Sequence, residues 1–422
     1  MELISFIDEL KWRGMIHDIM PGLEDYLRDE MRSAYIGFDP TSDSLHIGHL
    51  VPIMLLAHFQ KAGHRPIALV GGATGMIGDP SGKSVERNLL DEETIKSNQK
   101  VIKDQLAHFL DFNKSNNNAA LILNNLDWMK GLTFLDFTRD VGKHMTVNYM
   151  MSKDSVKNRI SGDQSEGMSF TEFSYQLVQG YDFLYLHKNH DCSIQMGGSD
   201  QWGNITSGTE LIRRMDNGKG YALTCPLITK SDGSKFGKTQ EGNIWLDANK
   251  TSVYKFYQYW LNTSDEDAKN YIKIFTFLDK KEIDTLISEH QKDPHLRILQ
   301  KALSKEMTST VHSKEAYDNA FKASNILFSN NFKKDIEQLN ESIFLEIFEG
   351  VPQYEISSSI FGKGLDMISA LSNETNFLKS NSEARRALKE NSISVNKIKV
   401  NEDYIIDNKD LISNKYIILN KG

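Results

Sequence analysis

Two histidines, His46 and His49, stand three residues apart where an apolar strand-like run gives way to a helix-like one. At this spacing both imidazoles lie on one face of the first helical turn. A helix N-terminus presents unpaired backbone N–H groups and a partial positive charge, which favour a phosphate group. Gly48, between the histidines, would let such a ligand approach the backbone closely. The pattern predicts a phosphate site, although a histidine pair alone is more often a plain helix start.

A second basic segment lies far along the chain. Lys235 and Lys238 flank Phe236 and Gly237, after a stretch rich in serine, glycine and aspartate. Such a composition indicates a surface loop. Two lysines on a loop can close over a polyphosphate and neutralise the charge that develops on a leaving group. A lysine-rich loop alone is usually a solvated turn, so it is the pair of motifs that carries the prediction.

Two further groups of polar residues lie on or next to predicted elements, one on a helix and one at the end of an apolar run. Tyr175, Gln179 and Asp182 follow one another at steps of four and three residues, which places them on one side of a helix. Gly198 and Asp200 follow the apolar run 192–196. Asp200 can accept hydrogen bonds from both hydroxyls of a ribose, and Gly198 permits a sugar to pack on the backbone.

The elements that must position these residues alternate between short apolar runs and longer helical segments. The runs are 33–38, 67–70, 120–123 and 192–196, and the helical segments include 51–62 and 93–110. This alternation predicts an α/β fold, a Rossmann-like doubly wound parallel sheet, up to about residue 224. Such a sheet binds its ligand at the carboxyl ends of its strands, where the motifs fall. An α-helical region with aromatic stripes follows from Thr251 to about Phe328.

One competing motif, Gly78 to Ser84, superficially suggests a P-loop NTPase. A P-loop needs four residues between its glycines, but Gly78 and Gly82 are separated by three, and Ile77 stands where the first glycine should be. The sequence therefore disfavours that reading.

The composition fits a chain of two or three ordinary globular domains. It has 422 residues, 39% of them hydrophobic and 25% charged. We expect neither a signal peptide nor a membrane span at the N-terminus, which lacks a basic start and a long apolar stretch. Cys192 and Cys225 form no CxxC pair, so we expect reduced core cysteines, no zinc and a cytoplasmic location. The net charge of −8 argues against general binding to DNA or other nucleic acid, although the segment after Leu371 is mildly basic.

His46 to His49 and Lys235 to Thr239 resemble the HIGH and KMSKS signatures of class I aminoacyl-tRNA synthetases, and the flanking residues resemble the bacterial tyrosyl-tRNA synthetase family. The resemblance covers nearly the whole chain. It implies that ATP activates L-tyrosine to tyrosyl-adenylate with release of pyrophosphate, and that tyrosine then passes to the 3′ end of tRNA(Tyr). The chain departs from the class signatures in two places. The lysine loop has Phe236, Gly237 and Thr239 where methionine, serine and serine are usual, and Pro52 lies in the first turns of the helix.

The resemblance assigns roles residue by residue. It implies a tyrosine site made of Tyr35, Asp39, Asp79, Tyr175, Gln179, Asp182 and Gln201. It implies a catalytic set on the phosphates made of Thr41, His46, His49, Lys83, Arg87, Lys235, Lys238 and Thr239. ATP would also contact Gly37, Gly48, Gly198, Asp200 and Lys238. Mg²⁺ is expected on ATP itself, with no protein ligand. Tyr35 and Asp182 would bind the phenol group of tyrosine. Their buried polar groups could be satisfied only by a ring that carries a hydroxyl.

RNA contacts and domains complete the expectations. The resemblance implies tRNA contacts at Arg213 and Arg214, and at Arg385, Arg386 and Lys389 in a C-terminal module similar to S4 RNA-binding domains. The expected domains are 1–224 with dimer-forming helices inserted at about 127–158, a helical domain at 225–330, a linker at 331–352 and the S4-like α+β domain at 353–422. The expected assembly is a homodimer. A tryptophan-specific relative and a non-catalytic RNA-binding regulator are the remaining alternatives.

Overall fold

A computed structural model describes residues 5–79, 91–161, 168–234, 236–239, 242–326, 332–349, 351–360 and 364–421. The chain divides into two compact units. The first consists of residues up to Ser252 together with Tyr259–Lys314, and the second consists of Val253–Gln258 and the chain from Glu315 onward.

A six-stranded sheet forms the centre of the first unit. Its strands are β1 (Asp18–Ile19), β2 (Ser33–Phe38), β3 (Arg65–Val70), β4 (Leu121–Asn124), β5 (Cys192–Gly198) and β6 (Tyr221–Cys225). They lie in the order β1-β6-β5-β2-β3-β4, and every neighbouring pair is parallel except β1 with β6. The expected doubly wound sheet is confirmed, with one correction: its edge strand β1 is antiparallel and was not predicted. The chain reverses its direction of travel between β2 and β5, and a crevice forms at such a switch point.

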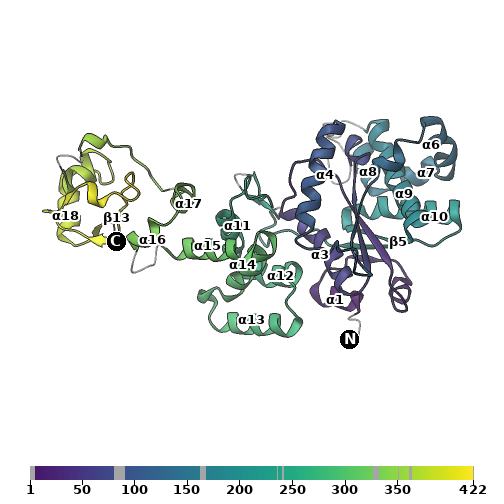
Figure 1. Ribbon diagram of the computed structural model, residues 1–422, viewed down its shortest axis with the longest axis horizontal. Helices are drawn as coiled ribbons and strands as arrows, with labels where there is room; N and C mark the ends of the chain where they lie inside the picture. The colour runs from purple at the N-terminus through teal and green to yellow at the C-terminus, as the bar shows by residue number, and fades with distance from the viewer. Residues whose placement is uncertain are drawn as a thin grey trace. The chain divides into compact units, whose positions relative to one another are not determined.

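Helices cover both faces of this sheet (Figure 1). Helix α3 (Leu50–Lys61) packs on β2 and β3, and α4 (Glu92–Leu106) connects β3 to β4. Helices α9 (Phe170–His190) and α10 (Trp202–Asp216) pack against each other and on β5. Pro52 lies in the first turn of α3, where a missing N–H leaves no helical hydrogen bond unmade.

A close contact between α9 and α10 fixes the orientation of α9. A Cβ atom at Gly208 of α10 would lie 2.8 Å from the ring of Phe183, and one at Gly180 of α9 would lie 3.0 Å from Leu211. Because both glycines lack side chains, the two helices approach closely. Phe183 and Leu184 then pack on the sheet with Tyr35, and the neighbouring Asp182 faces the crevice.

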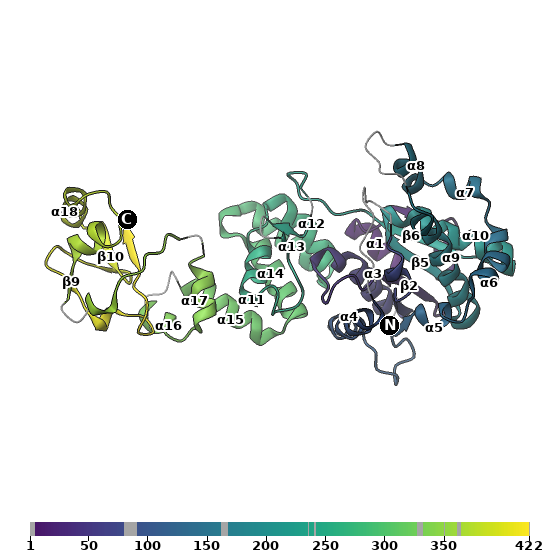
Figure 2. The same ribbon diagram turned by 90° about the horizontal axis from the view of Figure 1, so that it is seen from above.

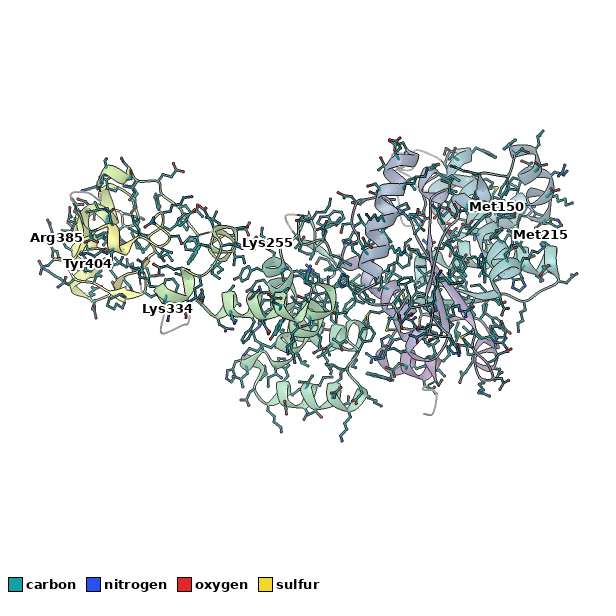
Figure 3. All side chains as sticks on the ribbon, viewed as in Figure 1. Met150, Met215, Lys255, Lys334, Arg385 and Tyr404 are labelled. Carbon is teal, nitrogen blue, oxygen red and sulfur yellow. The ribbon has the colours of Figure 1, made fainter. Side chains whose placement is uncertain are left out.

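Four short helices follow β4: α5 (Leu126–Met129), α6 (Phe134–Asp140), α7 (Val147–Met151) and α8 (Asp154–Ser161). Two smaller helices near the N-terminus are α1 (Phe6–Arg13) and α2 (Leu23–Tyr26). Met150 of α7 belongs to a small apolar cluster on which Met215 of α10 packs, so the inserted helices rest on α10. Figure 3 shows the two methionines side by side.

Helices α12 (Asp265–Phe275), α13 (Lys280–Lys292) and α14 (Ile298–Val311) pack together at the end of the first unit (Figure 2). Arg13 of α1 ties this group to the sheet domain, because its guanidinium donates to the carbonyls of Lys273, Thr276 and Leu278. Helix α11 (Val253–Leu261) contributes residues to both units. Within the described part of the chain, none of the helices has the length and apolar character needed to cross a membrane.

The second unit contains helices α15 (Lys314–Asn325), α16 (Phe332–Ile336), α17 (Glu341–Ile347) and α18 (Asn381–Lys389). Its strands are β9 (Leu365–Asp366), β10 (Ile393–Val395), β11 (Ile398–Lys399), β12 (Ile405–Ile406) and β13 (Leu419–Lys421). The central β10 pairs antiparallel with β11 and β13. The sequence predicts strands at 397–400 and 416–419, so the second of these begins three residues later than expected.

Candidate active site

A cavity of about 840 Å³ opens at the carboxyl ends of β2 and β5, at the switch point of the sheet. Thirteen residues that the sequence singles out line this cavity: Tyr35, Gly37, Asp39, Thr41, His46, His49, Asp79, Tyr175, Gln179, Asp182, Gly198, Asp200 and Gln201. They come from segments far apart in the chain. The structure thus brings most of the predicted site together.

Asp182 and Tyr35 form the closed end of the cavity. Asp182 is 1% exposed, and its carboxylate oxygens accept hydrogen bonds from Asn125 Nδ2 at 2.9 Å and Trp128 Nε1 at 2.8 Å. Burial raises the pKa of Asp182 to about 7, although these two hydrogen bonds oppose the shift. The buried hydroxyl of Tyr35 has no hydrogen-bond partner among the described residues. A ligand that reaches this end therefore needs a polar atom to satisfy Tyr35.

Asn125 and Trp128 hold Asp182 in place, and the sequence analysis did not predict either residue. Asn125 is fully buried, and besides holding Asp182 it accepts a hydrogen bond from the amide of Ala73 at 2.7 Å. Trp128 falls within the range assigned to the inserted helices, yet its indole contacts Asp182. The available signal is their position, because Asn125 directly follows β4 and Trp128 lies on α5, the next helix, at the ligand-binding edge of a parallel sheet.

The middle of the cavity is rich in hydrogen-bond acceptors. Asp39 accepts from the hydroxyls of Thr74 at 2.7 Å and Tyr175 at 3.1 Å. Asp79 accepts from Gln201 Nε2 at 2.8 Å. The Oε1 atom of Gln179 is buried and lacks a hydrogen-bond partner in the described part of the chain. Two carboxylates and an amide oxygen suit a cationic ammonium group.

Asp200 lies at the edge of this region, on the 3₁₀ turn that follows β5. Restricted hydration in the crevice, together with the charge of Asp79, raises the pKa of Asp200 above its ordinary value. A Cβ at Gly198 would lie 2.6 Å from a carboxylate oxygen of Asp200. Glycine is therefore required at position 198 for that carboxylate to fold back over the strand end.

The two histidines cap the turn that leads into α3. His46 precedes a 3₁₀ turn, Ile47–His49, and the amide of Gly48 donates to His46 Nδ1 at 3.0 Å. The amide of His46 lies 3.2 Å from His49 Nδ1, and the ring centroids are 4.1 Å apart. Because His46 Nδ1 accepts, the neutral ring carries its proton on Nε2 and can donate from there.

Gly48 does not line the cavity, in contrast to its expected contact with a ligand, and the structure gives it a different role. A Cβ there would lie 2.7 Å from the ring of His46. The absence of a side chain lets the imidazole fold over the turn.

The predicted lysine loop is only partly described. Lys83, Arg87 and Lys235 lie outside the described residues, and Lys238 and Thr239 are described only as the backbone of β7 (Lys238–Thr239), which pairs with β8 (Gly242–Asn243). Phe236 stacks on Phe275 with ring centroids 5.1 Å apart and an interplanar angle of 9°. This phenyl group also contacts the rings of Tyr259, Trp260 and Tyr271, so it anchors the loop to α11 and α12.

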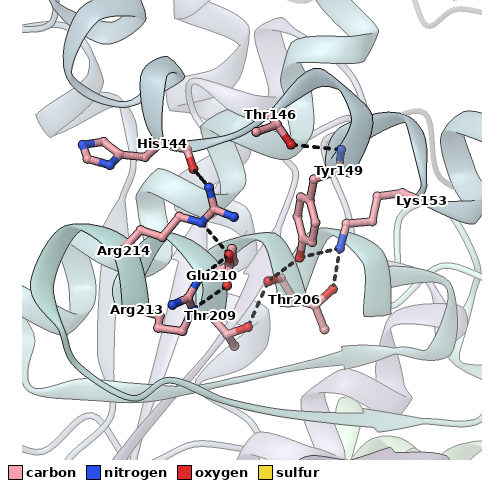
Figure 4. Close-up of polar contacts among 9 residues, drawn as sticks. All are labelled: His144, Thr146, Tyr149, Lys153, Thr206, Thr209, Glu210, Arg213 and Arg214. Atoms are coloured by element: carbon pink, nitrogen blue, oxygen red, sulfur yellow. Dashed lines mark hydrogen bonds and ion pairs between the residues drawn. The ribbon is translucent and has the colours of Figure 1, made fainter.

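The arginines predicted to contact RNA lie outside the cavity. Arg213 and Arg214 both bind Glu210, and Arg214 also donates to the carbonyl of His144 at 2.8 Å (Figure 4). These pairs lower the pKa of Glu210 to about 2, with Arg213 the largest cause. In the second unit, α18 exposes Arg385, Arg386 and Lys389. The Nε atom of Arg385 lies 3.3 Å from Glu402 Oε1.

Across the described ranges, no group of three or more histidine, cysteine and acidic side chains is arranged to hold a metal ion.

Comparison with known proteins gives consistent matches over the whole chain. A sequence profile described as tRNA synthetases class I (W and Y) matches residues 28–329, and one described as tyrosine–tRNA ligase SYY-like C-terminal domain matches residues 344–422. The tyrosine–tRNA ligase of Flavobacterium johnsoniae is 62% identical over 420 residues, covering 99% of this chain and 97% of that protein. The tyrosine–tRNA ligase of Bacteroides fragilis is 58% identical, covering 99% and 98%.

A solved structure is similar as well. The C-terminally truncated mitochondrial tyrosyl-tRNA synthetase of Aspergillus nidulans superposes with a TM-score of 0.67 at 32% identity, covering 75% of this chain and 92% of that one.

Proposed function

The chain belongs to the class I tRNA synthetases of the tryptophan and tyrosine group, and from this premise we propose that its cavity activates L-tyrosine with ATP and passes the tyrosyl group to tRNA(Tyr). Its activity is that of a tyrosine–tRNA ligase, specific for tyrosine rather than tryptophan. The tyrosine carboxylate attacks the α-phosphate of ATP, a P–O bond forms, and pyrophosphate leaves. A terminal ribose hydroxyl of tRNA then attacks the carbonyl of tyrosyl-adenylate, and AMP leaves.

The observation that carries the substrate assignment is the closed end of the cavity. The buried carboxylate of Asp182 and the buried, unsatisfied hydroxyl of Tyr35 stand there together. A phenol can donate to Asp182 and accept from Tyr35, whereas phenylalanine would leave the Tyr35 hydroxyl unpaired and would give Asp182 no hydrogen bond from the ligand. Asn125 and Trp128 orient Asp182 from the other side.

The first step needs no general base, because a carboxylate is already a nucleophile at neutral pH. Its rate then depends on orientation and on donors aimed at the transferring phosphate. We assign this role to Thr41, His46 and His49. We assign the departing pyrophosphate to Lys83, Arg87, Lys235, Lys238 and Thr239.

The remaining polar side chains of the cavity are assigned to the ammonium and carboxylate groups of tyrosine and to the ribose of ATP. Asp39, Asp79, Tyr175 and Gln179 would hold the ammonium group of tyrosine, and Gln201 its carboxylate. Asp200 would accept from the ribose hydroxyls, beside Gly37 and Gly198. A Cβ built at Gly37 would meet nothing within 4 Å, which leaves space for a nucleotide there. Mg²⁺ would arrive on the phosphates of ATP, since donors rather than a carboxylate cage face that end of the cavity.

A homodimer is part of the proposal. Phe134, Leu135 and Val147 on α6 and α7 are large apolar side chains exposed by 68%, 75% and 60%. Such a group of exposed apolar side chains is typical of a protein interface. We place the inserted helices, at about 127–158, in that interface. We also propose a catalytic domain at 1–224, a helical domain at 225–330, a linker at 331–352 and an S4-like domain at 353–422. Cys192 and Cys225, both buried and unpaired, suit the reducing cytoplasm.

The tRNA contacts are proposed at Arg213 and Arg214 and at Arg385, Arg386 and Lys389. Replacing Arg386 with alanine should raise the KM for tRNA about threefold and reduce its salt dependence, because one phosphate contact is lost. Pyrophosphate exchange should be unchanged. Lys409→Ala, which removes an exposed lysine of the same unit, is the control. Equal effects of both substitutions would reject a specific contact at Arg386.

The experiment that tests the function is amino-acid-dependent exchange of labelled pyrophosphate into ATP. Purified protein should catalyse exchange with tyrosine and not with tryptophan or phenylalanine. Exchange with tryptophan alone would overturn the assignment of the closed end.

A further inference from the structure

The segment Ile244–Leu246, directly after β8, pairs with the histidine segment. The amide of Ile47 donates to the carbonyl of Ile244 at 2.9 Å, and the amide of Leu246 donates to the carbonyl of Leu45 at 2.8 Å. His46 and Trp245 thus face each other across an antiparallel bridge. No sequence pattern predicted this pairing between two distant parts of the chain.

The same segment also forms a hydrogen bond with Gly237, in the middle of the lysine loop (residues 235–239). The amide of Ile244 donates to the carbonyl of Gly237 at 3.2 Å. A Cβ at Gly237 would lie 3.0 Å from Ile47 Cγ1, so this glycine packs directly on the histidine turn. Because these links are backbone hydrogen bonds, the loop and the histidine turn cannot shift independently near Ile244.

The side chain of Trp245 lines the cavity next to His46. The two ring centroids are 5.8 Å apart, with an interplanar angle of 71°, which is an edge-to-face contact. Lys250 also contacts the indole of Trp245, because its Nζ atom lies 4.9 Å from the ring centroid. The same Nζ atom pairs with Asp43 Oδ1 at 2.5 Å. The amide of Trp245 donates to Thr251 Oγ1 at 2.9 Å. The indole is therefore fixed before any ligand arrives.

We propose that Trp245 is a positioning residue that sets the imidazole of His46 for its contact with the ATP phosphates. Gly48 fixes one nitrogen of the ring through Nδ1, and the edge-to-face contact with Trp245 restricts the tilt of the ring plane. Together they aim the Nε2–H group. This inference rests on the proposed role of His46 at the phosphates.

The test compares Trp245→Leu, which is apolar but has no ring, with Trp245→Phe, which keeps a ring edge. The leucine variant should lower the rate of tyrosine-dependent pyrophosphate exchange about 10- to 100-fold, because small misplacements of a catalytic group have effects of that size. The phenylalanine variant should stay within about threefold of wild type, and the Kd for tyrosine without ATP should not change in either. Trp12→Leu removes another half-buried indole outside the cavity and serves as the control.

A spectroscopic measurement gives a second, independent readout. Trp245 lines the nucleotide end, so ATP binding should change the intrinsic tryptophan fluorescence of wild type, and this change should disappear in Trp245→Phe. A leucine variant within threefold of wild type in exchange would overturn the proposal, as would a fluorescence response that persists in Trp245→Phe or is absent from wild type. If Trp245→Leu does not fold, the fluorescence comparison decides alone. Loss of exchange in wild type itself would instead reject the proposed function.

Discussion

The two ends of the cavity are built differently. The tyrosine end is enclosed: Asp182 and Tyr35 are each 1% exposed and project from a long helix and a central strand. At the phosphate end, Thr41 is exposed and the histidines are half-buried, on a loop and a short turn. A neutral phenol can be distinguished from a phenyl ring only where water is excluded. A phosphate carries its charge into water, and exposed donors suffice to bind it.

The largest expected effect lies at the enclosed end. Asp182→Asn keeps the size of the side chain but replaces an acceptor oxygen with an NH₂ group that faces Asn125 or Trp128. We expect kcat/KM for tyrosine to fall about 10²- to 10³-fold, because a charged hydrogen bond is lost and a buried donor is left unpaired, at about 3–4 kcal/mol together. Asp25→Asn, at an exposed carboxylate of α2, is the control. A loss below tenfold would contradict the contrast between the ends.

His49→Ala tests the phosphate end. Activation should slow about 10²-fold, since a donor to the transferring phosphate is removed. The Kd for tyrosine should stay within about twofold, because the two ends bind different parts of the reactants. His17→Ala at the surface is the matched control. A large loss of tyrosine affinity would move His49 into the tyrosine site.

The enclosed end should also give the activity a pH dependence. Burial raises the pKa of Asp182 to about 7, so its carboxylate becomes protonated as the pH falls below that value. We expect kcat/KM for tyrosine to fall about tenfold from pH 8 to pH 6. The profile of Asp182→Asn should be flat over this range, and an equally steep profile in that variant would assign the titration to another group.

The same raised pKa affects stability. Between pH 4 and pH 7 the folded protein keeps the proton of Asp182, whereas the unfolded chain has already released it. The contribution of Asp182 therefore lowers the free energy of unfolding as the pH rises through this range.

The smallest expected effect concerns the anchor of the lysine loop. Phe236→Ala should lower the exchange rate about fivefold and raise the KM for ATP, because the loop loses aromatic contacts worth about 1 kcal/mol. Phe236→Met, the residue usual in class I signatures, should restore the rate. An alanine variant with wild-type KM for ATP would show that Phe236 has no part in placing the loop.

The sequence predicts the sheet well where apolar runs end sharply. Strand β2 coincides with the predicted run 33–38, and α3 ends as expected before Gly63, which adopts a φ of 91°. Strand β1 escapes prediction, because two residues carry no periodicity and their pairing with β6 is a tertiary effect. The helical spacing groups Asp182 with Tyr175 and Gln179, and the role proposed for Asp182 comes from the resemblance to the tyrosyl-tRNA synthetases. The contacts of Asn125, Trp128 and Trp245 could not be predicted, since the partner of each lies far away in the sequence.

The pairing of Leu45–Ile47 with Ile244–Leu246 bears on the order in which the enzyme matures during synthesis. The side chains assigned to the tyrosine end all precede residue 202, so a nascent chain contains them well before the segment that braces His46 has been translated. The chain between Ile47 and Ile244 forms a long loop, and closing it costs conformational entropy. The backbone hydrogen bonds of the pairing form after that cost and offset it. The amino-acid pocket can therefore assemble before the segment that completes the ATP end is available.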